Sequence, residues 1–217
     1  MTSRGAVRVR VPATSANLGP GFDSFGLALA RHDEVTAQVT AAGLGIEVAG
    51  EGAATVPRDE RHLVVRAMRA AFDVLGAQPA GLRLSCRNAI PHGRGLGSSA
   101  AAICAGVAAA RALVEDGHMR LDDAALLALA AEIEGHPDNV AACLLGGLTV
   151  AWRGGARAGD EPVGDVALRL APAPDVAAIV FVPAEALSIM TDSAGHLDPD
   201  LLRAFAPSML KGSALAA

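Results

Sequence analysis

Apolar and polar residues alternate along several short segments in the first half of the chain, a pattern typical of half-buried β-strands. The alternation predicts strands over residues 6–11, 34–40, 45–49 and 82–87. Pro12 is expected to end the first strand, because proline cannot donate a backbone hydrogen bond. Gly43 is expected to form a hairpin turn between the second and third strands, so the beginning of the chain is predicted to be a β-meander.

A helical period of apolar residues appears between these strands and dominates the middle of the chain. It predicts an amphipathic helix over 61–76, helices over 98–114 and 121–134, and a short helix ending at Leu145. The many alanines of 98–114 would let neighbouring elements approach closely. Strands are predicted over 148–153, 166–170 and 176–182, with a polar hairpin turn over 153–164.

Composition indicates which side chains fill the core and which partners are excluded. The chain is 52% hydrophobic but only 3% aromatic and has no tyrosine, so alanine, valine and leucine must form the core. The net charge is −5 and the basic residues are scattered along the sequence, which argues against a nucleic-acid partner. No apolar stretch reaches the ~18 residues of a membrane span, and residues 1–10 lack the apolar centre of a signal peptide.

The three cysteines, Cys86, Cys104 and Cys143, are odd in number, far apart and without CxxC spacing. This arrangement is typical of reduced, buried thiols rather than of a disulfide framework or a zinc site. The sequence therefore predicts a cytoplasmic protein.

A glycine-rich stretch before the helix at 98–114 is the strongest candidate for chemistry. It comprises Pro91, His92, Gly93, Arg94, Gly95, Leu96, Gly97, Ser98, Ser99, Ala100 and Ala101. Glycines let backbone N–H groups face a ligand, and a helix N-terminus adds unpaired donors, so the stretch predicts a phosphate site. A plain connecting turn is the alternative. The stretch is not a Walker A loop, because no lysine follows the last glycine.

A dinucleotide-binding loop is a weaker interpretation of the same stretch. Serine stands at position 98, where that pattern requires its third glycine. The pattern also needs an acidic residue about 20 positions further on, at the end of a strand. Glu115 and Asp116 lie at that distance, but they end a predicted helix.

Residues 134–139 place acidic, histidine and amide side chains in one turn between two helices. Glu134 or Asp138 could bind Mg²⁺ beside nucleotide phosphates, because Mg²⁺ takes one or two carboxylates together with phosphate and water oxygens. A serine hydroxyl from the glycine-rich stretch would complete the site. Alternatively, Asp138 and Asn139 only cap the next helix while Glu134 is solvated.

Residues 13–26 are small, polar and turn-forming, and they predict a loop rather than a helix or strand. Asn17 and Asp23 could be simple turn formers. Phe22 and Phe25 alternate with glycines there, which favours an ordered wall of a binding pocket over a plain connection.

These motifs resemble those of the GHMP small-molecule kinases. Residues 91–101, PHGRGLGSSAA, are similar to the second motif of that family. Residues 12–23, PATSANLGPGFD, and residues 134–141, EGHPDNVA, followed by LGG at 145–147, are similar to the homoserine kinase branch. The three motifs occur in the family's order, and the resemblance extends over residues 7 to about 188.

The resemblance implies transfer of the γ-phosphoryl group of ATP to the side-chain hydroxyl of L-homoserine, a small-molecule substrate, in threonine biosynthesis. It implies that residues 91–101 bind the ATP phosphates and that Ser98 and Glu134 hold Mg²⁺. Asn17 and Asp23 would face homoserine, with Asp23 opposite its ammonium group. Asp138 occupies the place of a base in other members, and Asn139 would orient the hydroxyl.

The resemblance also implies an α+β fold and a domain organisation. Residues 1–160 would form an N-terminal ATP-binding domain of the ribosomal-protein-S5 type, and residues 161–188 would begin a ferredoxin-like C-terminal domain that is incomplete. Homodimer formation is a further expectation, and no membrane partner is expected.

The sequence departs from the family pattern after Ser188. Residues 189–196 read IMTDSAGH, where the family continues with a threonine, an Ala-Arg pair and a Leu-Pro pair. The arginine that would clamp the substrate carboxylate is therefore not at its usual place. This change is typical of a frameshift or a truncated gene, with residues 189–217 a divergent tail, disordered or loosely helical around 201–205. Two alternatives follow: a catalytically impaired nucleotide-binding fragment, or a family kinase for another small alcohol.

Overall fold

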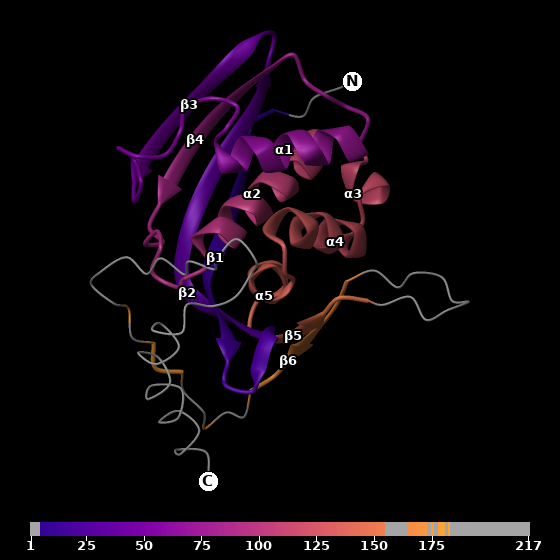
Figure 1. Cartoon of the computed structure of the whole chain (residues 1–217). Coiled ribbons are helices and arrows are strands. Elements are labelled where there is room, and N and C mark those ends of the chain that lie inside the picture. The colour runs from indigo at the N-terminus through magenta and orange to yellow at the C-terminus, as the bar shows by residue number, and fades with distance from the viewer. Residues whose placement is uncertain (1–4, 155–164, 173–174, 176–177, 181, 183–217) are drawn as a thin grey trace, which may run out of the picture.

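The computed structural model describes residues 5–154, 165–172, 175, 178–180 and 182. Within these residues six strands form one sheet, and the helices pack on one of its faces (Figure 1). The strands are β1 (Val7–Leu18), β2 (Gly21–Thr40), β3 (Gly43–Gly50), β4 (Gly81–Asn88), β5 (Leu148–Trp152) and β6 (Val166–Leu170). The helices are α1 (Leu63–Val74), α2 (Ser98–Leu113), α3 (Gly117–Arg120), α4 (Asp123–Glu134) and α5 (Asp138–Leu145). This arrangement confirms the predicted α+β class.

The long strand β2 connects the two parts of the sheet. Its first half pairs antiparallel with β5, and its second half pairs antiparallel with β4. The strand order is β3-β4-β2-β5-β6, and β1 runs antiparallel along β2. Because β4 leads into the glycine-rich stretch and β5 follows α5, β2 holds both candidate segments on one sheet.

The predicted β-meander is wrong in its pairing. The turn before Gly43 forms, but β3 pairs in parallel with β4, and β4 lies between β3 and β2. Burial explains the order: Leu82, Leu84 and Cys86 of β4 are almost fully buried, whereas β3 alternates between half-buried and exposed residues. A strand with the more apolar buried face takes the more central position.

The prediction that Pro12 ends the first strand is also wrong. The register of β1 against β2 shifts between Pro12 and Ala13, and the strand then continues to Leu18. A bulge accommodates a residue that cannot donate to the ladder. Residues 13–26, predicted as a loop, therefore form the two arms of a β-hairpin whose turn contains Gly19 and Pro20.

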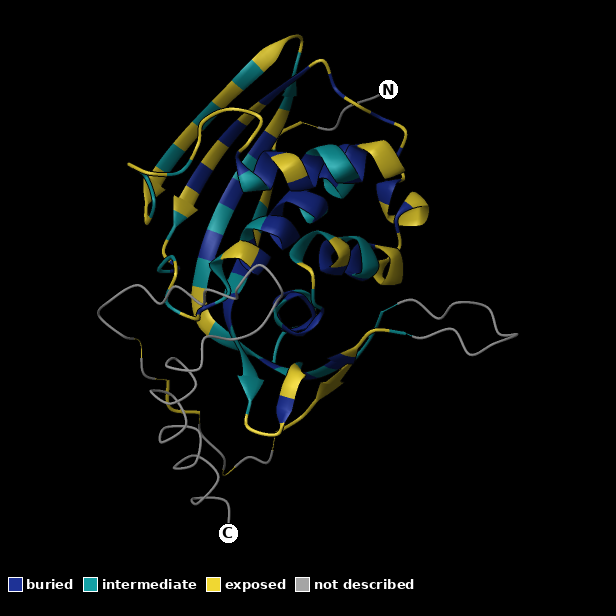
Figure 2. Cartoon of the chain, viewed as in Figure 1, coloured by how far each residue is buried: buried dark blue, intermediate teal, exposed yellow. Residues whose placement is uncertain are grey.

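The core lies between the sheet and the helices, as the dark residues in Figure 2 show. Alanine, valine and leucine make up most of it, as predicted, and Phe72 and Met68 are its largest fully buried side chains. The close approach predicted for 98–114 is confirmed where α2 meets α1. A Cβ atom at Gly106 would lie 2.5 Å from the carbonyl oxygen of Val64, so only glycine fits there.

The remaining elements agree with the sequence pattern where they are described. The four predicted helices are present as α1, α2, α4 and α5, and the short α3 is additional. β5 and β6 pair antiparallel, while the turn predicted between them lies mostly outside the described residues. The strand predicted over 176–182 is absent at its described residues, 178–180 and 182. The predicted tail, 189–217, lies outside the described residues.

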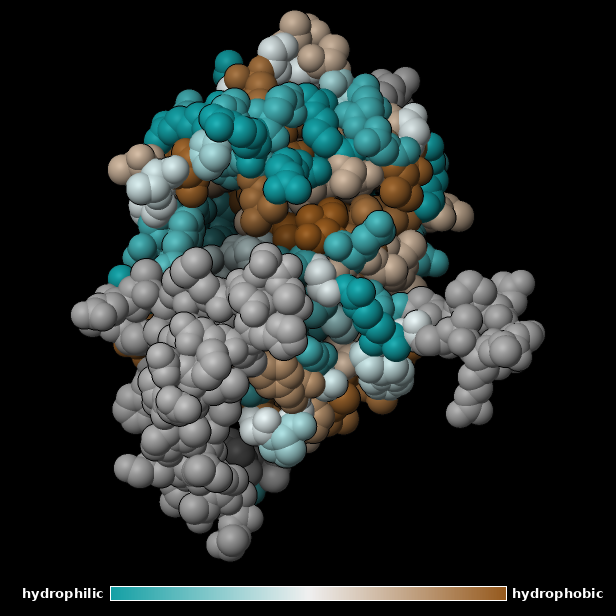
Figure 3. Space-filling model, viewed as in Figure 1, coloured by the Kyte–Doolittle hydropathy of each residue, from teal (hydrophilic) through white to brown (hydrophobic). Residues whose placement is uncertain are grey.

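The surface shows how polar and apolar side chains are distributed over the helical layer. Hydrophilic side chains predominate over α1, and hydrophobic ones gather between α1 and α4 (Figure 3). No helix in the described part of the chain is long and apolar enough to cross a membrane.

The three cysteines are free and buried, as predicted. Burial raises the pKa of the Cys86 thiol to about 11, and the charge of Asp33 adds to this shift. An unfolded thiol ionises at about pH 8.5, so the unfolded state releases its proton at a lower pH than the folded state. The contribution of Cys86 to stability is therefore complete below about pH 8.5 and is lost as the pH rises to about 11.

We therefore expect the free energy of unfolding, measured by urea titration, to fall as the pH rises through this range. Cys86→Ala should make the decrease less steep, because it removes one group that ionises more easily in the unfolded chain. The same slope in both proteins would contradict the raised pKa.

Candidate active site

The glycine-rich stretch links the end of β4 to the start of α2. Gly93, Gly95 and Gly97 have φ angles of +64°, +67° and +64°, in the left-handed region that favours glycine. Helix α2 starts at Ser98 and is 16 residues long. The first N–H groups of such a helix have no partner within it, so they are available to an anion.

Thr14 of β1 connects this loop to helix α5. Its backbone N–H donates to the carbonyl oxygen of Leu96 at 3.0 Å. Its hydroxyl donates to Oδ1 of Asn139 at 2.8 Å, and Thr14 is fully buried. A Cβ atom at Gly97 would collide with the Thr14 hydroxyl and lie 3.0 Å from Asn139 Oδ1. Three segments far apart in the sequence thus meet at one point.

Glu134, the last residue of α4, contacts the start of α2 just after the loop. The Ser99 hydroxyl donates to Oε1 of Glu134 at 2.6 Å. Burial raises the pKa of Glu134, although the bond from Ser99 and the nearby His136 oppose this shift. The structure therefore joins Glu134 to Ser99. Ser98, the predicted Mg²⁺ ligand beside Glu134, lines a neighbouring cavity together with Ser99.

Asp138 is a fully buried carboxylate at the start of α5. Its Oδ1 accepts the backbone N–H of Asn139 at 2.7 Å and is hydrogen-bonded to Nδ1 of His136 at 2.6 Å. The bond to Asp138 raises the pKa of His136. Oδ2 of Asp138 is buried without a hydrogen-bond partner among the described residues. Such an oxygen is costly in a protein interior and calls for a ligand, water or catalytic role.

Asn17 and Asp23 lie at the end of the β1–β2 hairpin. Both have left-handed backbones, with φ angles of 58° and 53°, and the N–H of Asp23 donates to Asn17 Oδ1 at 2.7 Å. This conformation is uncommon outside glycine and is tolerated best by asparagine and aspartate. The charge of Asp23 also raises the pKa of His136, so the hairpin end lies near the 134–139 turn.

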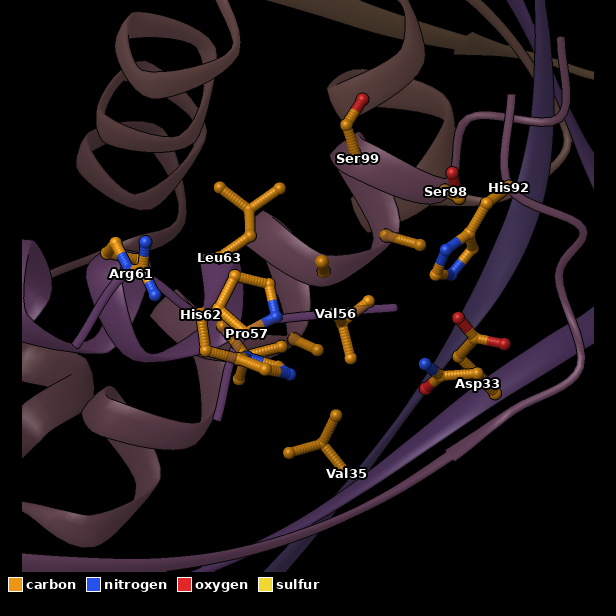
Figure 4. Close-up of a pocket in the computed structure, with 15 residues that line it drawn as sticks. Asp33, Val35, Val56, Pro57, Arg61, His62, Leu63, His92, Ser98 and Ser99 are labelled. Atoms are coloured by element: carbon orange, nitrogen blue, oxygen red, sulfur yellow. The ribbon is translucent and has the colours of Figure 1, made fainter. Parts of the chain in front are cut away.

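A cavity of about 260 Å³ adjoins the loop between α2 and the start of α1 (Figure 4). Apolar side chains such as Val35, Val56 and Leu63 line it, together with Ser98 and Ser99. The polar side chains of its wall include those of Asp33, His62 and His92. Burial lowers the pKa of His62, whose Nδ1 is buried without a partner among the described residues. A cavity with mainly apolar walls thus lies directly beside the glycine-rich loop.

The described residues contain no group of three or more His, Cys, Asp or Glu side chains placed to hold a metal ion. A bound metal would therefore combine Glu134 with serine hydroxyl oxygens and with oxygens of the ligand. Hard oxygen donors of this kind fit Mg²⁺, which normally binds with few protein carboxylates beside phosphates.

Comparison with known proteins agrees with this geometry. The family described as GHMP kinases N terminal domain matches residues 62–147, from the wall of the cavity to the end of α5. A homoserine kinase from Streptomyces coelicolor is 59% identical over 196 residues, which are 89% of this chain and 60% of that protein. The chain belongs to the GHMP kinase family.

Two further relatives support this membership. A homoserine kinase from Streptomyces avermitilis is 59% identical over 194 residues, covering 89% of this chain and 61% of the relative. The crystal structure of homoserine kinase from Cytophaga hutchinsonii matches with a TM-score of 0.59 and 33% identity, over 69% of this chain and 49% of that chain. This GHMP kinase chain thus spans about 60% of the length of the curated relatives it matches.

Sequence reasoning missed three residues of this candidate site: Thr14, Asp33 and His62. Thr14 lies inside the motif at 12–23 but has no charge to draw attention. Asp33 had a detectable signal, because it continues the alternation of Val35 and Ala37 onto the buried face of β2, where a charge is unusual. His62 gave none, because its burial depends on contacts with distant segments.

Proposed function

We propose that the chain is an ATP-dependent homoserine kinase, or the ATP-binding part of one. One observation carries the proposal: the glycine loop, the Ser99–Glu134 pair and the buried Asp138–Asn139–Thr14 group meet at the N-terminus of α2. This arrangement combines an anion site with carboxylates and an amide next to it. The relatives named homoserine kinases supply the acceptor, L-homoserine.

ATP would bind along the loop and into the cavity. The N–H groups of residues 91–101 and the positive end of the α2 dipole would hold the phosphates. The apolar side chains that line the cavity would receive the base and ribose, since it opens beside Ser98 and Ser99. Mg²⁺ would be held by Glu134 with Ser98 or Ser99 and phosphate oxygens, and it would neutralise the charge that develops on the transferring group.

The acceptor would lie between the hairpin end and the 134–139 turn. Asp23 would face the ammonium group of homoserine, with Asn17 beside it. Asn139, whose Oδ1 is occupied by Thr14, has its amide N–H₂ left to donate to the acceptor hydroxyl. The hydroxyl oxygen would form a bond to the γ-phosphorus, the bond from that phosphorus to ADP would break, and Asp138 would accept the hydroxyl proton. Phosphoryl transfer depends mainly on positioning and charge stabilisation, so these contacts matter more than any single proton transfer.

A direct test measures ADP release from MgATP with L-homoserine, mevalonate or galactose as acceptor. Release with homoserine alone, at the ~1–100 per second typical of kinases, would support the proposal. Release with another acceptor alone would contradict the homoserine assignment. MgATP binding without release would favour the alternative of an impaired nucleotide-binding fragment.

The proposed contact between Asp23 and homoserine predicts that a change at Asp23 weakens binding of the acceptor but not of the nucleotide. We expect Asp23→Ala to raise KM for homoserine about tenfold or more, because the ammonium group loses a charge partner. The Kd for MgATP, measured by calorimetry, should stay within about twofold, because Asp23 would contact the acceptor and not the nucleotide. Equal losses of both would indicate damage to the fold.

The two serines of the loop predict different losses of magnesium dependence. If Ser98 is the hydroxyl ligand, Ser98→Ala should raise the Mg²⁺ concentration for half-maximal activity about tenfold. Ser99→Ala should then have a smaller effect, through the orientation of Glu134. The reverse order would assign the ligand to Ser99, which contacts Glu134 in the structure, and no change in either variant would contradict this metal site.

The domain organisation belongs to the same proposal. Residues 1–160 would form the N-terminal domain of the ribosomal-protein-S5 type, and residues 161–188 would begin a ferredoxin-like domain. Strand β6 (Val166–Leu170) pairs with β5 in the same sheet, so the boundary between these two domains would lie after Leu170 rather than at residue 160. The cytoplasmic location and the homodimer also remain predictions, and light scattering of the purified chain would test the latter.

A further inference from the structure

Asp33 is a carboxylate on the buried face of the central strand β2. It shares that face with Val35 and Ala37 and is only 6% exposed. Burial raises the pKa of Asp33, because a charge is poorly solvated there. A buried carboxylate is stable in a protein only when hydrogen bonds replace its water, so its partners indicate why it is there.

Those partners are the two residues that lead into the glycine loop. Asp33 Oδ1 accepts the N–H of Ala89 at 2.6 Å and the N–H of Ile90 at 2.8 Å. Arg31, two residues earlier on β2, donates from Nε to the carbonyl oxygen of Ala89. The pairing of β2 with β4 ends at Glu34 and Arg87, so these side chains replace the ladder where the chain leaves the sheet.

The loop is thereby attached at both ends. Its beginning is held by Asp33, and its end is held by the bond from Thr14 to Leu96. Asp33 and His92 also point toward one another in the wall of the cavity (Figure 4). A loop that is held before its ligand arrives loses less conformational freedom on binding, which increases affinity.

We propose that Asp33 is a positioning residue that sets the start of the phosphate-binding loop. Its Oδ1 accepts the N–H groups of both Ala89 and Ile90, so the position of this one oxygen sets where the loop begins. The role in binding rests on the proposed function of the loop as an ATP site. The attachment of the loop is a property of the free protein and can be measured without nucleotide.

The test uses the 217-residue chain with Asp33 changed to Ala, Asn or Glu. Amide hydrogen exchange of residues 89–97 is measured without nucleotide, and the Kd for MgATP is measured by calorimetry. Asp33→Ala removes the acceptor, so we expect exchange at Ala89 and Ile90 to be about tenfold faster or more, and the Kd to rise about tenfold or more. Asp33→Asn keeps an oxygen at the same place and should stay within about threefold of the original Kd.

Two variants separate positioning from general stability and from charge. Val107→Ala truncates a fully buried side chain of α2 that does not line the cavity, so it should lower the melting temperature without changing the Kd. Asp33→Glu keeps the charge but displaces the acceptor by one methylene. We expect it to resemble Asp33→Ala, and it decides the question if Asp33→Ala does not fold.

Several results would overturn the proposal. Unchanged exchange in both Asp33→Ala and Asp33→Glu would show that Asp33 does not hold the loop. An equal loss in Asp33→Asn and Asp33→Ala would show that charge, rather than acceptor geometry, is what matters. If Val107→Ala lost as much stability as Asp33→Ala and its Kd rose equally, the effect of Asp33 on binding would be explained by general stability alone. If the original chain binds no MgATP, the proposed function fails, and the exchange measurements alone decide whether Asp33 holds the loop.

Discussion

Gly97→Ala is expected to weaken MgATP binding about 100-fold or more, because it displaces the loop from the start of α2. The φ angle of Gly97 is +64°, where an L-residue is strained by about 1–2 kcal/mol. The new methyl group would also collide with the hydroxyl of Thr14 and crowd Asn139 Oδ1. Neither atom can yield without breaking the hydrogen bond between them, so the loop must move instead.

Gly43→Ala is the matched control for this substitution. Gly43 has a φ angle of +78°, and a Cβ atom there would meet nothing within 4 Å. The control should therefore lose a similar amount of stability to backbone strain and keep its affinity for MgATP. Calorimetry gives both Kd values, and thermal unfolding gives the stability loss. An unchanged Kd in Gly97→Ala would show that the loop binds no phosphate in this conformation.

Asp138→Asn is expected to lower the turnover of homoserine phosphorylation about 100-fold, in the range found for removal of a catalytic acid or base. The amide keeps an oxygen for the N–H of Asn139, but it places a donor where the unpaired Oδ2 was. The Kd for MgATP should stay within about threefold, because in the proposed site the phosphates would bind to the loop and not to Asp138.

Asp122→Asn provides the control for loss of one carboxylate in the same helical layer. Asp122 caps α4 by accepting the N–H of Ala125 at 2.8 Å, a role that asparagine also fills. This variant should retain full turnover in the ADP-release assay. If Asp138→Asn also retained most of the turnover, Asp138 would only orient His136 and Asn139, and proton acceptance would pass to another group.

The local elements and the chemistry-bearing stretches could be predicted from the sequence because their signals are short-range. The positions of α1, α2, α4 and α5 follow from apolar periodicity and from glycines at their ends. The glycine-rich stretch at 91–101 and the turn at 134–139 were recognisable from residue type and order. Left-handed backbone angles at Gly93, Gly95 and Gly97 are what such a glycine pattern predicts.

Pairing between distant segments could not be predicted. It depends on which of several strands buries the most apolar surface against a given partner, and these strands lie far apart in the sequence. The alternation that identified β3 was correct, but only the deeper burial of β4 explains why β3 pairs with β4 and not with β2. The extension of β1 past Pro12 likewise depends on a bulge against β2. A proline predicts that pairing ends locally, but here β1 pairs with β2 again after the bulge.

By itself, the sequence determined that this protein has a glycine-rich loop at the start of a helix, carboxylates in a later turn and a small-residue core. Only the tertiary structure decided that Ser99 is hydrogen-bonded to Glu134, Thr14 to Asn139 and Asp33 to the start of the loop. Residue types and their spacing indicate local backbone preferences and the chemistry that each side chain can perform. Contacts between residues 35 to 125 positions apart arise when the sheet and the helices bury a shared core.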